Sequence, residues 1–215
     1  MSKSKETTEV TPLVIKFSET DKMSGVKSLS TQAGITCPRA NKSEVCKTCY
    51  AMKHRYLYKN VKAKRMQTLK DFYDPRFVDV VVKEMFNFRF FRWFDSGDIA
   101  SVVMIKKIIE IIERTPHVQH WLPTNSWDVP KFAKYFEKLD ALPNVTVRFS
   151  SRKFNTPIDW PMHEHTSSMV ATTDMLDSEL PEGSFKCPAP KQNNKCETCR
   201  ACYDKNVKII VYKKH

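Results

Sequence analysis

Two cysteine segments with the same spacing constrain this chain more than any other feature. The segment that begins at Cys37 and the segment that begins at Cys187 both read Cys-Pro, seven residues, Cys, x-Thr, Cys. A seventh cysteine extends the second segment by a further Cys-x2-Cys step. Such steps bring two sulfurs to one centre and are typical of thiolate ligands of a metal ion or an iron–sulfur cluster. The predicted metal ligands are Cys37, Cys46 and Cys49 in the early set and Cys187, Cys196, Cys199 and Cys202 in the late set.

The two sets differ in number, which predicts different roles. Four thiolates complete the coordination of a structural zinc ion or a [4Fe–4S] cluster, whereas three leave one position open for a reacting ligand. The Cys-x2-Cys-x2-Cys run favours iron–sulfur, as one or two [4Fe–4S] clusters, with zinc as the alternative metal. His54 is a candidate fourth early ligand if the metal is zinc. A third arrangement, in which both segments pool their sulfurs on one centre, also stays open.

Composition indicates a folded protein of a reducing compartment. Hydrophobic residues make up 41% of the chain and charged residues 28%, so a packed core is expected. No apolar run approaches a membrane span and the N-terminus has no apolar signal region, so we expect a cytoplasmic protein. Disulfides are disfavoured there, and seven cysteines cannot all pair within the chain. We expect a disordered tail at 1–11 and a single α/β domain at 12–215, with cysteine loops at 37–49 and 187–202.

The charge predicts a polyanionic partner. The formal net charge is +12, and residues 51–70 hold seven lysines and arginines and no acid. A basic segment of this kind can contact the phosphates of a nucleic acid, and a solvated helix face is the plainer interpretation. Tyr56 and Tyr58 within it could stack on bases.

Strand-like and helix-like segments alternate along the chain, which favours a mainly parallel sheet. Such a sheet is either open or a partial (β/α)6-type barrel, with the late cysteine segment as a cluster-binding appendage. The predicted helices are 49–69, 74–88 (with Asp74 as N-cap), 101–115 and 129–142. The predicted strands are 12–17, 88–94, 118–124, 144–151, 167–174 and 207–214.

Polar residues follow most of these strands, where sites gather in α/β proteins. They occupy 18–19, 95–98, 124–127, 150–153 and 172–174, and we expect them to share one site. Gly97 lies in such a run, and a glycine there lets a ligand approach the backbone closely.

With these motifs in order, the chain resembles a family of phage proteins known as gene product 88. The resemblance covers roughly residues 13–215 and implies architecture more than activity. It is carried by Lys-Phe-Ser at 16–18, Thr-Cys-Tyr-Ala at 48–51, Arg-Trp-Phe-Asp-Ser-Gly-Asp at 92–98, Leu-Pro-Thr at 122–124, Val-Arg-Phe-Ser-Ser at 147–151 and the late cysteines.

That family is in turn similar to radical S-adenosylmethionine (SAM) enzymes. The similarity implies a partial (β/α)6 barrel in which the early cysteines hold a [4Fe–4S] cluster with one iron open to SAM. Gly97 and Asp98 would then meet the SAM amino group, and Ser150 and Arg152 its carboxylate or ribose. The late set would hold an auxiliary cluster. The spacing in this chain is Cys-x8-Cys-x2-Cys, where that superfamily has Cys-x3-Cys-x2-Cys.

Three hypotheses of function follow. The leading one is a radical-SAM-like, phage-encoded enzyme acting in the host cytoplasm on a nucleic acid or another phosphorylated substrate. A ferredoxin or flavodoxin is the expected electron donor. The second is a non-catalytic iron–sulfur protein for electron transfer or redox sensing. The third is a zinc-stabilised protein that binds nucleic acid through 51–70.

Overall fold

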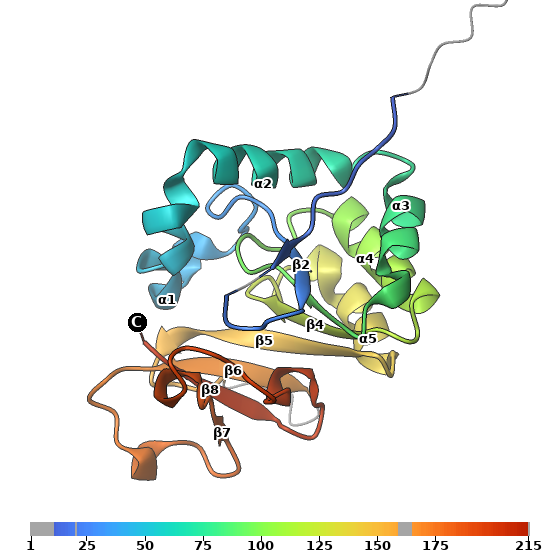
Figure 1. The fold of residues 1–215 in the computed structure, drawn as a ribbon. Helices are drawn as coiled ribbons and strands as arrows, with labels where there is room; N and C mark the ends of the chain where they lie inside the picture. The colour runs from blue at the N-terminus through green and yellow to red at the C-terminus, as the bar shows by residue number, and fades with distance from the viewer. Residues whose placement is uncertain (1–10, 20, 159–164, 215) are drawn as a thin grey trace, which may run out of the picture.

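A mainly parallel sheet runs through the molecule (Figure 1). The computed structural model describes residues 11–19, 21–158 and 165–214, so the predicted tail lies, apart from Thr11, outside the described residues. Within these ranges eight strands follow one another in the order β1-β2-β3-β4-β5-β6-β8-β7, and β1 alone pairs antiparallel. The strands are β1 Ser18–Glu19, β2 Lys27–Leu29, β3 Phe90–Trp93, β4 Gln119–Thr124, β5 Val145–Phe154, β6 Thr166–Ala171, β7 Phe185–Lys186 and β8 Ile209–Lys213.

Helices connect the first parallel strands. Ser101 caps α4, where its hydroxyl accepts a hydrogen bond from the backbone N–H of Met104. In the described part of the chain, no helix is both long and apolar enough to cross a membrane. The α-helices are α1 Glu44–Lys47, α2 Lys59–Asp71, α3 Phe77–Glu84, α4 Val102–Arg114 and α5 Ala133–Ala141.

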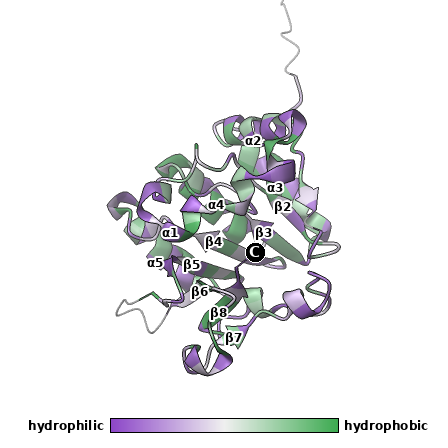
Figure 2. Cartoon of the chain, turned by 90° about the vertical axis from the view of Figure 1, so that its left-hand side faces the viewer, coloured by the Kyte–Doolittle hydropathy of each residue, from purple (hydrophilic) through white to green (hydrophobic). Residues whose placement is uncertain are grey.

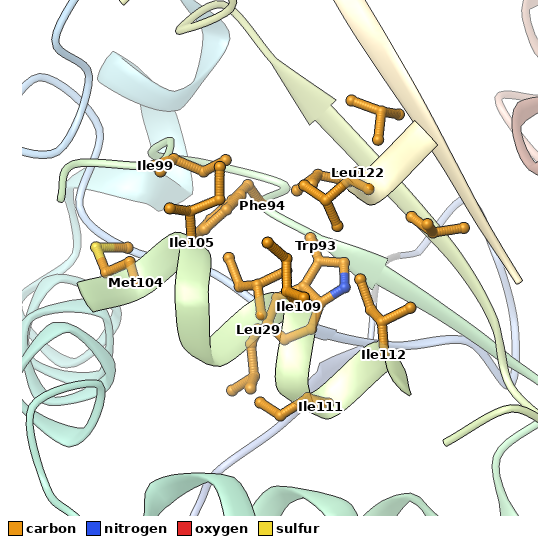
Figure 3. Packing of buried hydrophobic residues seen from close by; sticks show 14 of the residues in the cluster. Leu29, Trp93, Phe94, Ile99, Met104, Ile105, Ile109, Ile111, Ile112 and Leu122 are labelled. Atoms are coloured by element: carbon orange, nitrogen blue, oxygen red, sulfur yellow. The ribbon is translucent and has the colours of Figure 1, made fainter. Parts of the chain in front are cut away.

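The core lies between these helices and one face of the sheet. Ile105 and Ile109 of α4 pack against Trp93 of β3 and Leu122 of β4, as Figure 3 shows. Each such side chain contributes about 1.5–3 kcal/mol when buried. In Figure 2 the hydrophobic colour is concentrated on the central strands and the hydrophilic colour on the surrounding loops and helices.

Side chains alternate along each strand, so the second face of the sheet carries different residues. The register pairs Ser28 of β2 with Arg92 of β3, Arg92 with Trp121 of β4, and Trp121 with Thr146 of β5. These four therefore lie opposite the helix-covered core. This second face is where the late cysteine segment packs, because Cys196 and Cys202 contact the cluster that contains Trp121.

The sequence predicted the α/β class and most parallel strands. Expected strands at 88–94, 118–124, 144–151, 167–174 and 207–214 correspond to β3, β4, β5, β6 and β8. The prediction for 12–17 is wrong: this apolar segment packs on the core without a strand partner, and pairing begins only at Ser18. The first parallel strand is instead β2, whose Lys-Ser-Leu sequence has no apolar alternation to reveal it.

Two predicted helices differ in extent. Residues 49–58 form two short 3-10 turns, Tyr50–Met52 and His54–Leu57, before α2 begins. The Tyr50 hydroxyl donates to the Asp95 carbonyl, which ties this segment to the end of β3. The helix expected from 74 starts later, because the Asp74 carboxylate accepts from the backbone and side chain of Arg76 and forms a turn of its own.

His120 of β4 generates a prediction about acid stability. Burial lowers its pKa to about 3, while its Nε2 lies 2.9 Å from the Thr115 hydroxyl. The unfolded chain, with a pKa near the usual 6.5, binds this proton more readily than the folded one. The free energy of unfolding therefore falls as pH drops from 6.5 toward 3, by up to about 1.4 kcal/mol per pH unit from this residue.

The substitution His120→Phe should flatten that dependence, and urea unfolding at pH 7 and pH 5 measures it. The exposed His54 provides the control, because His54→Asn should leave the dependence unchanged. Equal acid slopes in His120→Phe and the unsubstituted protein would contradict the assignment.

Candidate metal centres

The early cysteine loop lies at the carboxyl end of β2. The hydroxyl of Ser43 accepts from the backbone N–H of Cys46 at 3.2 Å and caps α1. One turn later, the backbone N–H of Cys49 donates to the Cys46 carbonyl, which forms the local Cys-x2-Cys turn. Burial raises the pKa of Cys37 to about 12, and the nearby Cys46 and Cys49 thiols act in the same direction. The three early sulfurs therefore lie near one another.

The late cysteines line a single pocket, together with residues that include Met23 and Tyr203. Backbone hydrogen bonds fix the loop: Cys187 N–H donates to Val211 of β8, and Cys196 N–H donates to Lys22 beside β1. Cys199 N–H donates to the Cys196 carbonyl at 2.8 Å, which closes a second Cys-x2-Cys turn. All four late sulfurs thus belong to one pocket on the second face of the sheet.

Arg148 of β5 holds the late segment against the sheet. Its side chain is fully buried, and its guanidinium donates to the backbone carbonyls of Ala201, Cys202, Asp204 and Val207 at 2.7–3.2 Å. The Thr146 hydroxyl adds a hydrogen bond of 2.7 Å to the Tyr203 carbonyl. The sequence does not reveal this role of Arg148, because nothing local to β5 shows that a loop about fifty residues later returns to it.

The donor sets, three and four thiols, have the chemistry of soft metal ligands. All seven cysteines are free. Within the described residues, no group of three or more His, Cys, Asp or Glu side chains is placed to hold a metal ion. Burial raises the pKa of Cys202 to about 11, so this thiol is protonated at neutral pH. Metal binding would require the thiols to release their protons.

Asp98 joins the ends of two strands. Its buried carboxylate accepts from the Thr124 hydroxyl at 2.7 Å, the Asn125 N–H at 2.8 Å and the Ser126 hydroxyl at 2.9 Å, besides the N–H of Ile99. Burial raises its pKa, and the hydrogen bonds act against that shift. The predicted convergence of 95–98 and 124–127 is therefore present, and Asp98 is its centre.

Asn125 connects the early cysteines to this strand-end network. Its side-chain amide donates to the Cys46 sulfur at 3.2 Å, and its carbonyl oxygen accepts from Arg152 Nε at 2.7 Å. Arg152 also donates to both oxygens of the Asp128 carboxylate, which in turn accepts from Arg39 in the early loop. The polar run 124–127 predicted a shared site without distinguishing Asn125, and the position of this residue in that run was the available signal.

Some of the predicted site residues therefore lie close together, and others do not. Arg152 lies beside the early sulfurs through Asn125, and its guanidinium stacks on the Trp127 ring at 4.2 Å. Ser150 lies next to it, where its carbonyl accepts from the Trp127 indole. Of the late cysteines, Cys196 and Cys202 pack instead against the cluster that contains Trp121.

The basic segment 51–70 divides into exposed and engaged cations. The buried Arg65 donates to the Asp95 carboxylate at 3.2 Å, and Lys64 donates to the Phe17 carbonyl. Both hold α2 in place. The exposed cations of this segment include Lys53, Lys59 and Lys62.

Gly97 has no room for a side chain. Its φ is +76°, and a Cβ atom there would stand 2.1 Å from the Thr31 hydroxyl and 2.7 Å from the Thr31 carbonyl. The group that approaches the Gly97 backbone is thus the chain's own segment that leads into the early cysteine loop, and the approach of a ligand at Gly97 stays a prediction.

This geometry predicts a difference between two glycine substitutions. Gly25 shares the φ of +76° but has open space around it. Gly25→Ala should cost roughly 1–2 kcal/mol of unfolding free energy for the left-handed backbone alone. Gly97→Ala should cost about 2–3 kcal/mol more, because the clash must displace Thr31. Urea unfolding compares the two, and equal losses would contradict the packing argument.

The family of the chain emerges from comparison with known proteins. The family model described as Gene product 88 matches residues 2–205. No curated protein and no solved structure matches the chain. These comparisons include no radical SAM protein, so that similarity stays a prediction. The match spans nearly the whole sequence, and the chain belongs to the phage gene product 88 family.

Proposed function

We propose that this phage protein carries two iron–sulfur centres and acts as a radical-SAM-like enzyme in the host cytoplasm. The two cysteine sets differ in their number of sulfurs and in their surroundings, and this difference is the observation that carries the proposal. Four late cysteines line one pocket, and three early cysteines lie at the strand ends beside a polar network. A complete set suits a closed cluster, and an incomplete set suits an open one.

The late cysteines would hold the closed cluster. The pocket contains no competing acidic or histidine ligand among its described lining residues, so its chemistry is that of a four-thiolate site. Arg148 and Thr146 hold the loop that carries these sulfurs. This arrangement fixes the late sulfurs against the sheet and separates them from the strand ends.

The early cysteines would hold the open cluster, which when bound supplies the electron for reductive cleavage of SAM. Arg152 and Ser150 lie in the same network as Cys46, which supports their assignment to the SAM carboxylate or ribose. To bind SAM, Arg152 would have to exchange one of its hydrogen bonds to Asn125 or Asp128. Asp98 already accepts four hydrogen bonds from the chain. We therefore assign Asp98 chiefly to holding the strand ends, since contact with an amino group would require it to give up one of these bonds.

Six of the seven parallel strands, β2, β3, β4, β5, β6 and β8, correspond in number to a partial (β/α)6 barrel, and the short β7 extends the sheet beyond β8. We propose that architecture. We also propose a nucleic acid or another phosphorylated molecule as substrate. The exposed Lys53, Lys59 and Lys62, with Tyr58 at 60% exposure, support it. A ferredoxin or flavodoxin of the host is the proposed electron donor.

Iron content tests the two-centre proposal. Anaerobically purified protein should contain about eight irons per chain, and its optical and EPR spectra should show [4Fe–4S] clusters. Cys199→Ser and Cys46→Ser should each lose about four irons, and Cys199→Ser should also lower the urea midpoint more, because the late centre closes its loop. About four irons in the unsubstituted protein would instead indicate one centre, and a colourless zinc protein would overturn the proposal in favour of a zinc-stabilised nucleic-acid-binding protein.

A SAM assay separates the enzyme from a non-catalytic electron-transfer or redox-sensing protein. With reductant and SAM, the iron-loaded protein should release 5′-deoxyadenosine, and SAM should change the EPR signal of the early centre alone. Arg152→Gln should weaken the SAM response while iron content stays at the unsubstituted level. An early centre whose spectrum ignores SAM, with no 5′-deoxyadenosine formed, would leave the electron-transfer reading in place.

A further inference from the structure

Three side chains on the second face of the sheet form one contact group. The guanidinium of Arg92 stacks on the Trp121 ring at 4.6 Å. The Trp121 ring in turn meets the Tyr203 ring edge-on, with centroids 6.0 Å apart. Arg92 belongs to β3, Trp121 to β4 and Tyr203 to the late cysteine loop, so the group joins the sheet to that loop.

Each member of the group has a buried donor without an acceptor. Among the described residues, Arg92 Nε, Trp121 Nε1 and the Tyr203 hydroxyl have no hydrogen-bond partner. Trp121 is 5% exposed and Tyr203 8% exposed, so bulk water has little access to hydrogen-bond with their donors. Leaving a donor unpaired costs about 1–3 kcal/mol, and buried donors in native proteins are nearly always paired. Three in mutual contact indicate that an acceptor belongs here.

Members of the group lie near residues of both cysteine segments. On the late side, Cys196 and Cys202 pack against the hydrophobic cluster that contains Trp121 and Tyr203. On the early side, Tyr50 directly follows Cys49 in the chain, and the Arg92 charge acts on the Tyr50 hydroxyl, whose own hydrogen bond goes to the Asp95 carbonyl. The guanidinium is therefore close to a sequence neighbour of each sulfur set.

Arg92 shares its nearby carboxylate with a second arginine. Asp95, the carboxylate that acts on Arg92, already accepts two hydrogen bonds from the buried Arg65. A further negative group beside Arg92 would therefore interact favourably with this guanidinium.

A thiolate-bound iron–sulfur cluster would supply the hydrogen-bond acceptors and the negative charge that the group of Arg92, Trp121 and Tyr203 lacks. Its sulfur atoms accept hydrogen bonds, its net charge is negative, and that charge becomes more negative on reduction. A nearby cation stabilises the reduced form more than the oxidised form and so raises the reduction potential. The potential of the cluster would then depend on the chain's own donors.

We propose that Arg92 is a shared positive charge that raises the reduction potentials of both centres, and that the Trp121 and Tyr203 donors act on the late centre alone. Arg92 is a positioning residue in this scheme, since it acts through the clusters. The inference rests on the proposed function, because it requires both iron–sulfur centres. It adds that a single charge influences the reduction potentials of two separate centres.

The test is an EPR-monitored redox titration of anaerobically purified, full-length protein. Arg92→Gln removes the charge and should lower the potentials of both centres. Arg92→Lys keeps the charge and should restore most of the shift. Tyr203→Phe removes one hydroxyl and keeps the ring, so it should lower only the late potential. Arg89→Gln changes an exposed arginine near the same strand and should change neither.

The outcomes separate this inference from the proposed function. Absence of iron in the unsubstituted protein would end the proposed function itself. Two iron-loaded centres whose potentials are the same in Arg92→Gln and the unsubstituted protein would overturn the inference and leave the function standing. If Arg92→Gln does not load iron, Tyr203→Phe decides: a late potential equal to that of the unsubstituted protein overturns the inference.

Discussion

The hydrogen bonds of the buried Arg148 guanidinium determine what covers the second face of the sheet. Its hydrogen bonds to four carbonyls of the late cysteine segment satisfy backbone groups that the sheet would otherwise bury unpaired. A charged donor makes stronger hydrogen bonds than a neutral one, which offsets the cost of burying it. Because the segment is held there, a loop takes the place of helices on the second face of the sheet.

The two faces of the sheet therefore have different physical characters. Isoleucines of α4 and aromatic rings of β3 form an apolar core on one face (Figure 3). The other face carries Arg92, Trp121, Thr146 and Arg148, with the late cysteines packed near them. Polar and charged side chains on a covered face are costly unless they bind something, and this face is where we place the electrostatic control of the proposed centres.

Much of the fold followed from local pattern, because helix and strand periodicity is written in neighbouring residues. Segments such as 101–115 and 118–124 became α4 and β4 with ends shifted by a residue or so. The failures were β2, which is short and lacks alternation, and 12–17, which is apolar but packs on the core without a strand partner. Pairing of such short segments is decided by distant neighbours and not by their own composition.

By itself the sequence determined the seven candidate ligands, their division into three and four, and the polar strand ends at 95–98 and 124–127, since these are matters of spacing. Tertiary structure alone decided that Asn125 meets the Cys46 sulfur, that Asp98 is saturated by its own chain, and that Arg92 lies near residues of both cysteine segments. The reason is physical: each of these contacts joins segments far apart in the chain, and only the packing of the sheet sets which of them meet.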